Sequence, residues 1–221
     1  MSPRGQTIVA IILISVGLGG SGCTRTTYGA YEDEPSEVPL LDRRVAVEID
    51  RVFYAAPPEC VIILPTRGTL DFEAAAVIER SLERHLGQRL PKVIGALARH
   101  RLERARGFNL SDPTDWIYFS RETGCGAVLE SEAHAVNADY FLVWAQRSAD
   151  LEVTLRRIGD GTVLWRARHL AQRSDGGLPL GPISLTISTV EAGRFHGDTD
   201  ILPSLIDDAV RRIVASLPDV R

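Results

Sequence analysis

The 221-residue sequence has no catalytic or nucleotide-binding signature, and this absence narrows the classes of function that it can serve. It has no Gly-x-Ser-x-Gly motif, no phosphate-binding loop and no dinucleotide-binding glycine fingerprint. No two of its histidines have the spacing of metal ligands: His85, His100, His134, His169 and His196. The net charge of −4 argues against nucleic-acid binding through a basic surface. We therefore expect a non-enzymatic binding protein without a cofactor, a metal or a small-molecule substrate.

Long apolar runs are scarce, and the run at residues 8–18 is too short to cross a membrane comfortably as a helix. It follows Arg4 and precedes a stretch of small residues that ends at Cys23, which is the arrangement of a signal peptide. The residues around Cys23 resemble the lipobox of bacterial lipoproteins: Ser21 and Gly22 fit the motif, whereas Gly20 stands where leucine is usual. The alternative is an ordinary secretory signal in which Cys23 is incidental.

The lipobox resemblance implies a cellular location and a domain organisation. Residues 1–22 would be the signal peptide, and Cys23 would carry palmitate and other acyl chains, which together anchor a protein stably. An aspartate after the cysteine would resemble the inner-membrane retention signal, but Thr24 stands there, so we expect the periplasmic face of the outer membrane. Residues 23–44 would form a lipidated, flexible tether that reaches roughly 65 Å when fully extended. Residues 45–221 would form a single periplasmic domain.

The sequence has only three cysteines, and two of them, Cys60 and Cys125, remain in the body of the exported chain. An oxidising compartment favours a disulfide between such a pair. Each cysteine lies just before an apolar strand run, so the two residues would meet if those strands are neighbours. The alternative is a pair of buried, reduced thiols.

Alternating apolar and polar residues predict two strands around Gly159-Asp160-Gly161. The side chains of Leu151, Val153 and Leu155 would share one face of the first strand. Asp-Gly tolerates the positive φ angles of tight turns, so this stretch predicts a hairpin. Residues 139–145 also form an apolar run, but we find no pair of long alternating segments of the kind that forms membrane-inserted hairpins.

The rest of the chain predicts a mixed α/β (α+β) fold. The apolar run 60–64 is typical of a central strand, residues 71–86 of a helix that begins at Asp71, and residues 92–94 of a second strand, so the three form a β-α-β unit. Val45 to Tyr54 suggests an edge strand. We expect a mixed sheet with antiparallel hairpin strands and packed helices, including a C-terminal helix near residues 205–217.

A basic helix at residues 95–106 is the candidate docking element. Arg99, Arg101 and Arg104 are predicted on its outer face, with Leu97 and Leu102 inward. These arginines would bind anionic headgroups or an acidic partner, or they would simply form a solvated helix face. The pair Trp144 and Trp165 suggests an aromatic sugar platform, although alternation favours core packing for Trp165.

The segments 61–65, 122–129 and 159–169, on a chain with a lipobox, resemble a group of periplasmic lipoproteins. This group includes the TolB amino-terminal domain, the curli-secretion lipoprotein CsgG, the exopolysaccharide lipoprotein PelC and the penicillin-binding-protein activator LpoB. The resemblance implies an assembly or export accessory that docks to an envelope protein or to copies of itself. The alternatives are a lipoprotein activator of a peptidoglycan synthase and, less favoured, a periplasmic hydrolase.

Overall fold

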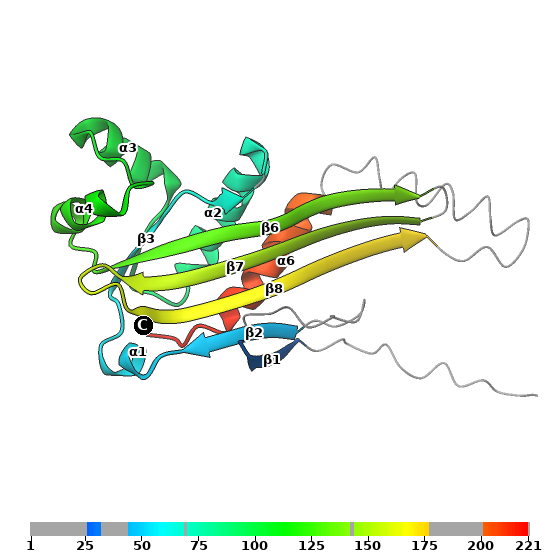
Figure 1. Ribbon diagram of the computed structural model, residues 1–221, viewed down its shortest axis with the longest axis horizontal. Coiled ribbons are helices and arrows are strands. Elements are labelled where there is room, and N and C mark those ends of the chain that lie inside the picture. Colours follow the sequence, from blue (N-terminus) through cyan, green and yellow to red (C-terminus); the bar gives the residue numbers. More distant parts are fainter. Residues whose placement is uncertain (1–25, 32–43, 69, 142–143, 177–200, 221) are drawn as a thin grey trace, which may run out of the picture.

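The computed structural model describes residues 26–31, 44–68, 70–141, 144–176 and 201–220 (Figure 1). Its strands are β1 (Thr27–Ala30), β2 (Arg44–Ile49), β3 (Cys60–Ile63), β4 (Arg67–Gly68), β5 (Lys92–Ile94), β6 (Ala127–Phe141), β7 (Trp144–Arg157) and β8 (Val163–Gly176). Its helices are α1 (Arg51–Ala55), α2 (Phe72–Leu86), α3 (Ala96–Arg106), the 3-10 turn η1 (Pro113–Asp115), α4 (Trp116–Thr123) and α6 (Ile201–Ala215). None of these helices is long and apolar enough to cross a membrane.

The strands form one mixed sheet in the order β1-β2-β8-β7-β6-β3-β5, with β4 paired to β6. β3 lies between β5 and β6 and is parallel to both. β6, β7 and β8 are antiparallel neighbours, as hairpin connections require. The predicted α+β class, with a mixed sheet and a C-terminal helix, is confirmed.

The β-α-β unit forms because its boundary residues suit their positions. All four residues of β3 are buried, as expected of a strand covered on both faces. The Asp71 side chain accepts a hydrogen bond from the Ala74 N–H at 2.7 Å and so caps α2, while Gly87 follows its end. After this helix the chain returns as β5 beside β3.

Two apolar cores lie on opposite faces of the sheet. The larger one joins α2 and α6 to the sheet through residues such as Ile78, Leu82, Ile206 and Ile213. The smaller one packs α4 and its neighbouring loop against β3 and β6. α3 and α4 lie at one end of the molecule, and β6, β7 and β8 extend toward the other (Figure 1).

The hairpin between β7 and β8 forms at the predicted turn. The Arg157 N–H donates to the Thr162 carbonyl at 2.9 Å, and Gly161 has a φ of 72°. The Asp160 carboxylate accepts from the Thr162 N–H at 3.0 Å, and this backbone hydrogen bond lowers the pKa of Asp160. Gly161 supplies the positive φ that other residues adopt only with strain.

The tether interpretation is wrong for the residues around β1. Thr27–Ala30 pairs in parallel with Arg44–Val47 and therefore belongs to the sheet. Tyr31 extends this contact, because the guanidinium carbon of Arg166 lies 3.8 Å from the centre of its ring. The predicted edge strand at residues 45–54 is also corrected: β2 ends at Ile49, α1 follows, and β1 covers the outer side of β2.

Candidate interaction surface

Strands β6, β7 and β8 continue side by side beyond the rest of the sheet (Figure 1). We call this extension the arm and define it as residues 135–141, 144–150 and 170–176. Its pairing is continuous from Ala135↔Asp150 to Phe141↔Trp144, and β8 follows β7 as far as Gly176. β6 has 15 residues and β7 has 14, so these strands are longer than the sequence indicated. The apolar run 139–145 is divided between them.

Both outer edges of the arm lack a strand partner among the residues that the structure describes. On the β8 side, pairing with β2 reaches His169 and goes no further. On the β6 side, pairing with β4 ends at Ala133. The N–H and carbonyl groups of an open strand edge can pair with a strand of another molecule. Within the described residues, the arm therefore has two backbone edges without a further strand.

The sheet face opposite the larger core is polar near the base of the arm. On this face Arg156 Nε is 2.9 Å from Glu130, and His134 Nε2 is 3.1 Å from Glu152. Further pairs join Arg168 to Asp150 at 2.6 Å and Arg166 to Glu48 at 2.8 Å. Such partly exposed pairs contribute roughly 0.2–1 kcal/mol each. Each of these charged groups therefore has a partner of opposite sign on this face.

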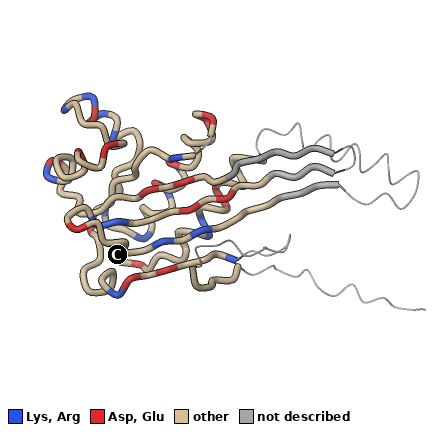
Figure 2. Tube along the Cα trace, viewed as in Figure 1, with Lys and Arg blue, Asp and Glu red and all other residues tan. Residues whose placement is uncertain are grey.

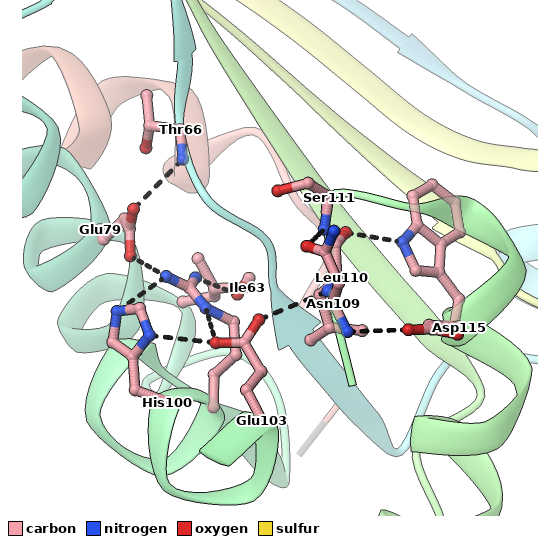
Figure 3. Close-up of polar contacts among 11 residues, drawn as sticks. Ile63, Thr66, Glu79, His100, Glu103, Asn109, Leu110, Ser111 and Asp115 are labelled. Carbon is pink, nitrogen blue, oxygen red and sulfur yellow. Dashed lines mark hydrogen bonds and ion pairs between the residues drawn. The ribbon is translucent and has the colours of Figure 1, made fainter. Parts of the chain in front are cut away.

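A buried ion pair joins α2 to α3 at the end of β3 (Figure 3). Arg99 is 1% exposed, and its Nη2 donates to the Glu79 carboxylate at 2.8 Å. Its Nη1 donates to the Ile63 carbonyl at 2.6 Å, and Glu79 also accepts from the Thr66 N–H at 3.1 Å. This pair connects two helices to the carboxyl end of the central strand.

This geometry corrects the predicted docking residues. Arg99 of α3 and Glu79 of α2 are buried and do not lie on the outer faces of their helices. Leu97, which was predicted to point inward, is 63% exposed. The reason is electrostatic: a guanidinium and a carboxylate can be buried when each is paired with the other and accepts or donates further hydrogen bonds. Among the described residues, Arg99 Nε makes no hydrogen bond, and it lies 4.0 Å from the Glu103 carboxylate. Arg99 is therefore unavailable to a partner.

The other two predicted docking arginines do lie at the surface. Arg101 and Arg104 are exposed on α3. Basic residues gather along this helix, and Arg106 Nη2 reaches Glu122 of α4 at 2.6 Å (Figure 2). Their docking role stays a prediction.

Two hollows in the described part of the molecule are candidate ligand sites. One, of about 220 Å³, is lined by Leu64, Pro65, Thr66, Arg67, Leu110, Ser111, Pro113, Trp116 and Glu130. The other, of about 810 Å³, is lined by Ala56, Pro57, Pro58, Glu59, Cys60, Pro91, Lys92, Gly124 and Val220. No histidine lines either hollow, and the Cys60 sulfur is in a disulfide. Thr66, Ser111 and Glu130 share the smaller hollow, and the Glu130 carboxylate there is paired with Arg67 and Arg156. Covalent catalysis requires instead a nucleophile that is hydrogen-bonded to its base.

Cys60 and Cys125 form a disulfide whose Cα atoms are 4.6 Å apart. Cys60 begins β3, and Cys125 lies two residues before β6, so parallel pairing of these strands brings the two cysteines together. The bridge spans 65 residues of sequence. Closing so long a loop contributes roughly 2–5 kcal/mol to stability.

Trp165 is fully buried, and its Nε1 donates to Ser216 Oγ at 3.2 Å, so the sugar-platform interpretation is wrong for this residue.

His169 is 3% exposed, and its Nδ1 lies 2.9 Å from the Arg44 carbonyl. Burial lowers the pKa of His169, which favours the neutral ring. Cys23 and His196 lie outside the described residues. Within the described residues, no three His, Cys, Asp or Glu side chains form a group that could hold a metal ion.

No protein-family profile matches the chain, and no protein with curated annotation matches its sequence. Solved structures of bacterial lipoproteins share part of its backbone course. Lipoprotein GNA1162 from Neisseria meningitidis is 14% identical, with 64% of this chain and 100% of that chain covered and a TM-score of 0.46. A PelC dodecamer from Paraburkholderia phytofirmans is 12% identical, with 76% and 95% covered and a TM-score of 0.40. The LpoB C-terminal domain from Salmonella enterica is 17% identical, with 56% and 91% covered and a TM-score of 0.39. The predicted resemblance to CsgG and TolB stays a prediction.

Proposed function

We propose that the protein is an outer-membrane lipoprotein anchored through Cys23. Its domain acts at the periplasmic membrane surface as a non-enzymatic assembly or export accessory. It works by docking to an envelope protein or to copies of itself. The observation that carries this proposal is the arm, in which three paired strands have two backbone edges that no other described strand covers.

The position of β1 supports action close to the membrane. Cys23 precedes Thr27 by four residues, and four residues span at most about 14 Å. A lipidated Cys23 therefore holds the sheet near the bilayer, and the long reach expected of a 23–44 tether is lost. The alternative role, activation of a peptidoglycan synthase at a distance, draws no support from this geometry.

The described side chains support binding rather than catalysis. The histidines have structural partners: His85 contacts Asp207 at 2.9 Å, and His100 contacts Glu103 at 3.0 Å. His169 is bound to the backbone of β2. An enzyme needs a reactive group oriented by a neighbour within an accessible pocket. In the smaller hollow, Glu130 is paired with Arg67 and Arg156, and the Thr66 hydroxyl is hydrogen-bonded to Ser131.

The test measures self-association and partner binding at the arm edge. Gln172 lies in β8 beyond its pairing with β2, so Gln172→Lys places a charge at the open edge, where lysine blocks strand addition. Gln172→Thr is the matched control, since threonine favours strands. We expect light scattering of the lipidated protein in detergent, or cross-linking in the envelope, to show an assembly that only the lysine variant loses. Monomers without a cross-linked partner in the unchanged protein would contradict the proposal.

A further inference from the structure

The smaller hollow, of about 220 Å³, lies at the carboxyl end of the central strand β3, where residues 64–66 leave the sheet and line it. From β3 the chain continues to α2, which packs in the larger core. From the neighbouring parallel strand β5 it continues to α3, whose Leu102 packs against the smaller core on the other face. In open α/β sheets, ligands bind outside the carboxyl ends of strands at the point where such connections diverge. The hollow therefore lies where this topology favours a ligand.

A tryptophan ring lines the hollow in a fixed position. Trp116 begins α4 and is partly buried, and its Nε1 donates to the Leu110 carbonyl at 3.0 Å. Because the indole N–H is already used in this hydrogen bond, the residue offers a ligand the apolar surface of its ring. The other apolar residues that line the hollow are Leu64, Pro65 and Pro113.

The charged groups of the hollow balance one another. Arg67 Nη2 donates to one oxygen of Glu130 at 3.2 Å, and Arg156 Nε donates to the other at 2.9 Å. Glu132 lies 3.9 Å from the same Arg67 nitrogen. An anion would therefore meet two carboxylates beside Arg67, and a cation would meet two guanidinium groups beside Glu130. An uncharged ligand avoids both conflicts.

Hydrogen-bonding groups remain accessible beside the apolar surface. The Arg67 side chain is 63% exposed, and the exposed Ser111 adds a hydroxyl group. An apolar side chain of a partner protein would cover these groups without pairing them, which costs free energy. A ligand that combines an apolar face with a polar rim satisfies both parts of the lining.

A pyranose sugar ring has this combination. Its C–H face packs on an aromatic ring, and its hydroxyl groups hydrogen-bond with the polar side chains around it. Sites that enclose a whole small molecule usually have volumes of roughly 300–1,000 Å³. At about 220 Å³, the smaller hollow is below that range and suits a single ring whose neighbours in a longer glycan extend into solvent.

We propose that the smaller hollow binds one uncharged sugar ring of a glycan, which stacks on Trp116 and is hydrogen-bonded by Arg67 and Ser111. Glu130 orients Arg67, and the Leu110 carbonyl orients Trp116. The site is formed without the residues of the arm, so it goes beyond the proposed function and does not depend on it. Peptidoglycan strands and other envelope polysaccharides share this ring chemistry, and the test separates the two sources.

The test titrates the full-length protein, in a detergent without sugar headgroups, with two uncharged oligosaccharides. Chitotetraose has the N-acetylated rings of the peptidoglycan backbone, whereas cellotetraose has rings with hydroxyl groups alone. We expect isothermal titration calorimetry to show saturable binding of at least one of them, at a single site per chain. Binding of chitotetraose alone would support peptidoglycan, and binding of cellotetraose would support another polysaccharide. Absence of binding by both would overturn the proposal.

A first pair of variants tests the stacking contact. Trp116→Ala should weaken sugar binding by roughly tenfold, as the loss of one aromatic stacking contact does. Tyr118→Ala is the matched control, because Tyr118 lies on the same helix, is 54% exposed and does not line the hollow. It should retain the affinity of the unchanged protein. Melting temperatures establish that both variants are folded.

A second pair keeps the tryptophan and tests the polar rim. Arg67→Ala should weaken binding by roughly threefold to tenfold through the loss of hydrogen bonds. Because the Arg67 side chain is largely exposed, the variant should fold normally. Arg101→Ala, at an exposed position of α3, is the matched control. Unchanged affinity in both Trp116→Ala and Arg67→Ala would place the sugar elsewhere and overturn the proposal. Sugar binding that persists in protein without self-association or a cross-linked partner would contradict the proposed function alone.

Discussion

The body of the sheet and the arm are made from the same three strands, but different interactions hold them. In the body, Leu155 and Trp165 are register partners, and both are fully buried in the core that includes α6. In the arm, β6 and β8 have only β7 as a strand partner among the described residues. Burial stabilises the body and reaches only the base of the arm, at Ala149 and Ala171, whereas the described edges of the arm have no further strand. The comparison indicates that the body determines stability, and we propose that the arm mediates interaction.

The test with the largest expected effect introduces alanine in both regions and compares the free energies of unfolding. Trp165→Ala should lower the free energy of unfolding by roughly 3–5 kcal/mol, because it leaves a large cavity in the core. Gln172→Ala at a partly exposed position of the arm should change it by less than about 0.5 kcal/mol, as substitutions away from the core usually do. Urea denaturation of the two variants measures both values. Equal losses would show that the arm is part of the cooperative core.

A second test separates a buried arginine from an exposed one on the same helix. Arg99→Ala leaves the Glu79 carboxylate buried without its partner, which typically costs about 3–5 kcal/mol. Arg101→Ala should change the free energy of unfolding by less than about 0.5 kcal/mol. Chemical denaturation followed by circular dichroism gives both values. A small effect of Arg99→Ala would mean that the ion pair does not hold α3 against α2.

A third test examines the turn at the body end of β7 and β8. Gly161 has a φ of 72°, whereas Gly159 is not among the glycines with positive φ, and a Cβ would meet no neighbour at either position. Gly161→Val should therefore cost roughly 1–2 kcal/mol through backbone strain alone. Gly159→Val is the matched control and should cost less. Melting temperatures that fall equally would contradict the assigned turn conformation.

The test with the smallest expected effect concerns how stability depends on pH through His169, at the base of the arm. Burial lowers the pKa of His169 below its ordinary value of 6.5, so the unfolded chain binds a proton more readily than the folded one. The stability that His169 contributes is therefore present above pH 6.5 and is lost as the pH falls toward its folded pKa. His169→Gln should flatten this part of the stability profile, as measured by denaturation across a pH series. An unchanged slope would assign the titration to another group.

The sequence predicts those parts of the fold that have a local cause. Asp71 begins α2 because its carboxylate caps a free N–H, and Gly161 marks the hairpin because it tolerates positive φ. The alternation of Leu151, Val153 and Leu155 shows which side of β7 is buried. Each of these signals acts over a few residues and is independent of the distant chain.

What the sequence did not reveal depends on partners far away along the chain. Arg99 was assigned to the surface because charge normally lies there, and only the position of Glu79, 20 residues earlier, reverses that rule. Glu79 did carry a signal, since it lies three residues before Leu82 and seven before Leu86, on the same face of α2. β1 is too short to be distinguished from a tether until β2 pairs with it. The sequence analysis recorded 139–145 only as an apolar run, whereas residues 139–141 belong to β6 and residues 144–145 to β7.

The most direct measurement of the central claim changes the distance between the anchor and the sheet. A flexible glycine-serine spacer inserted between Thr24 and Thr27 lengthens the short connection to β1 and leaves the body intact. The same spacer inserted after Pro35, between β1 and β2, is the control, because it leaves the connection from Cys23 to Thr27 unchanged. Both variants are tested for complementation in a strain whose phenotype depends on this gene. We predict that the first insertion abolishes function in a folded, lipidated protein and that the second preserves it. Full function of the first variant would contradict action at the membrane surface.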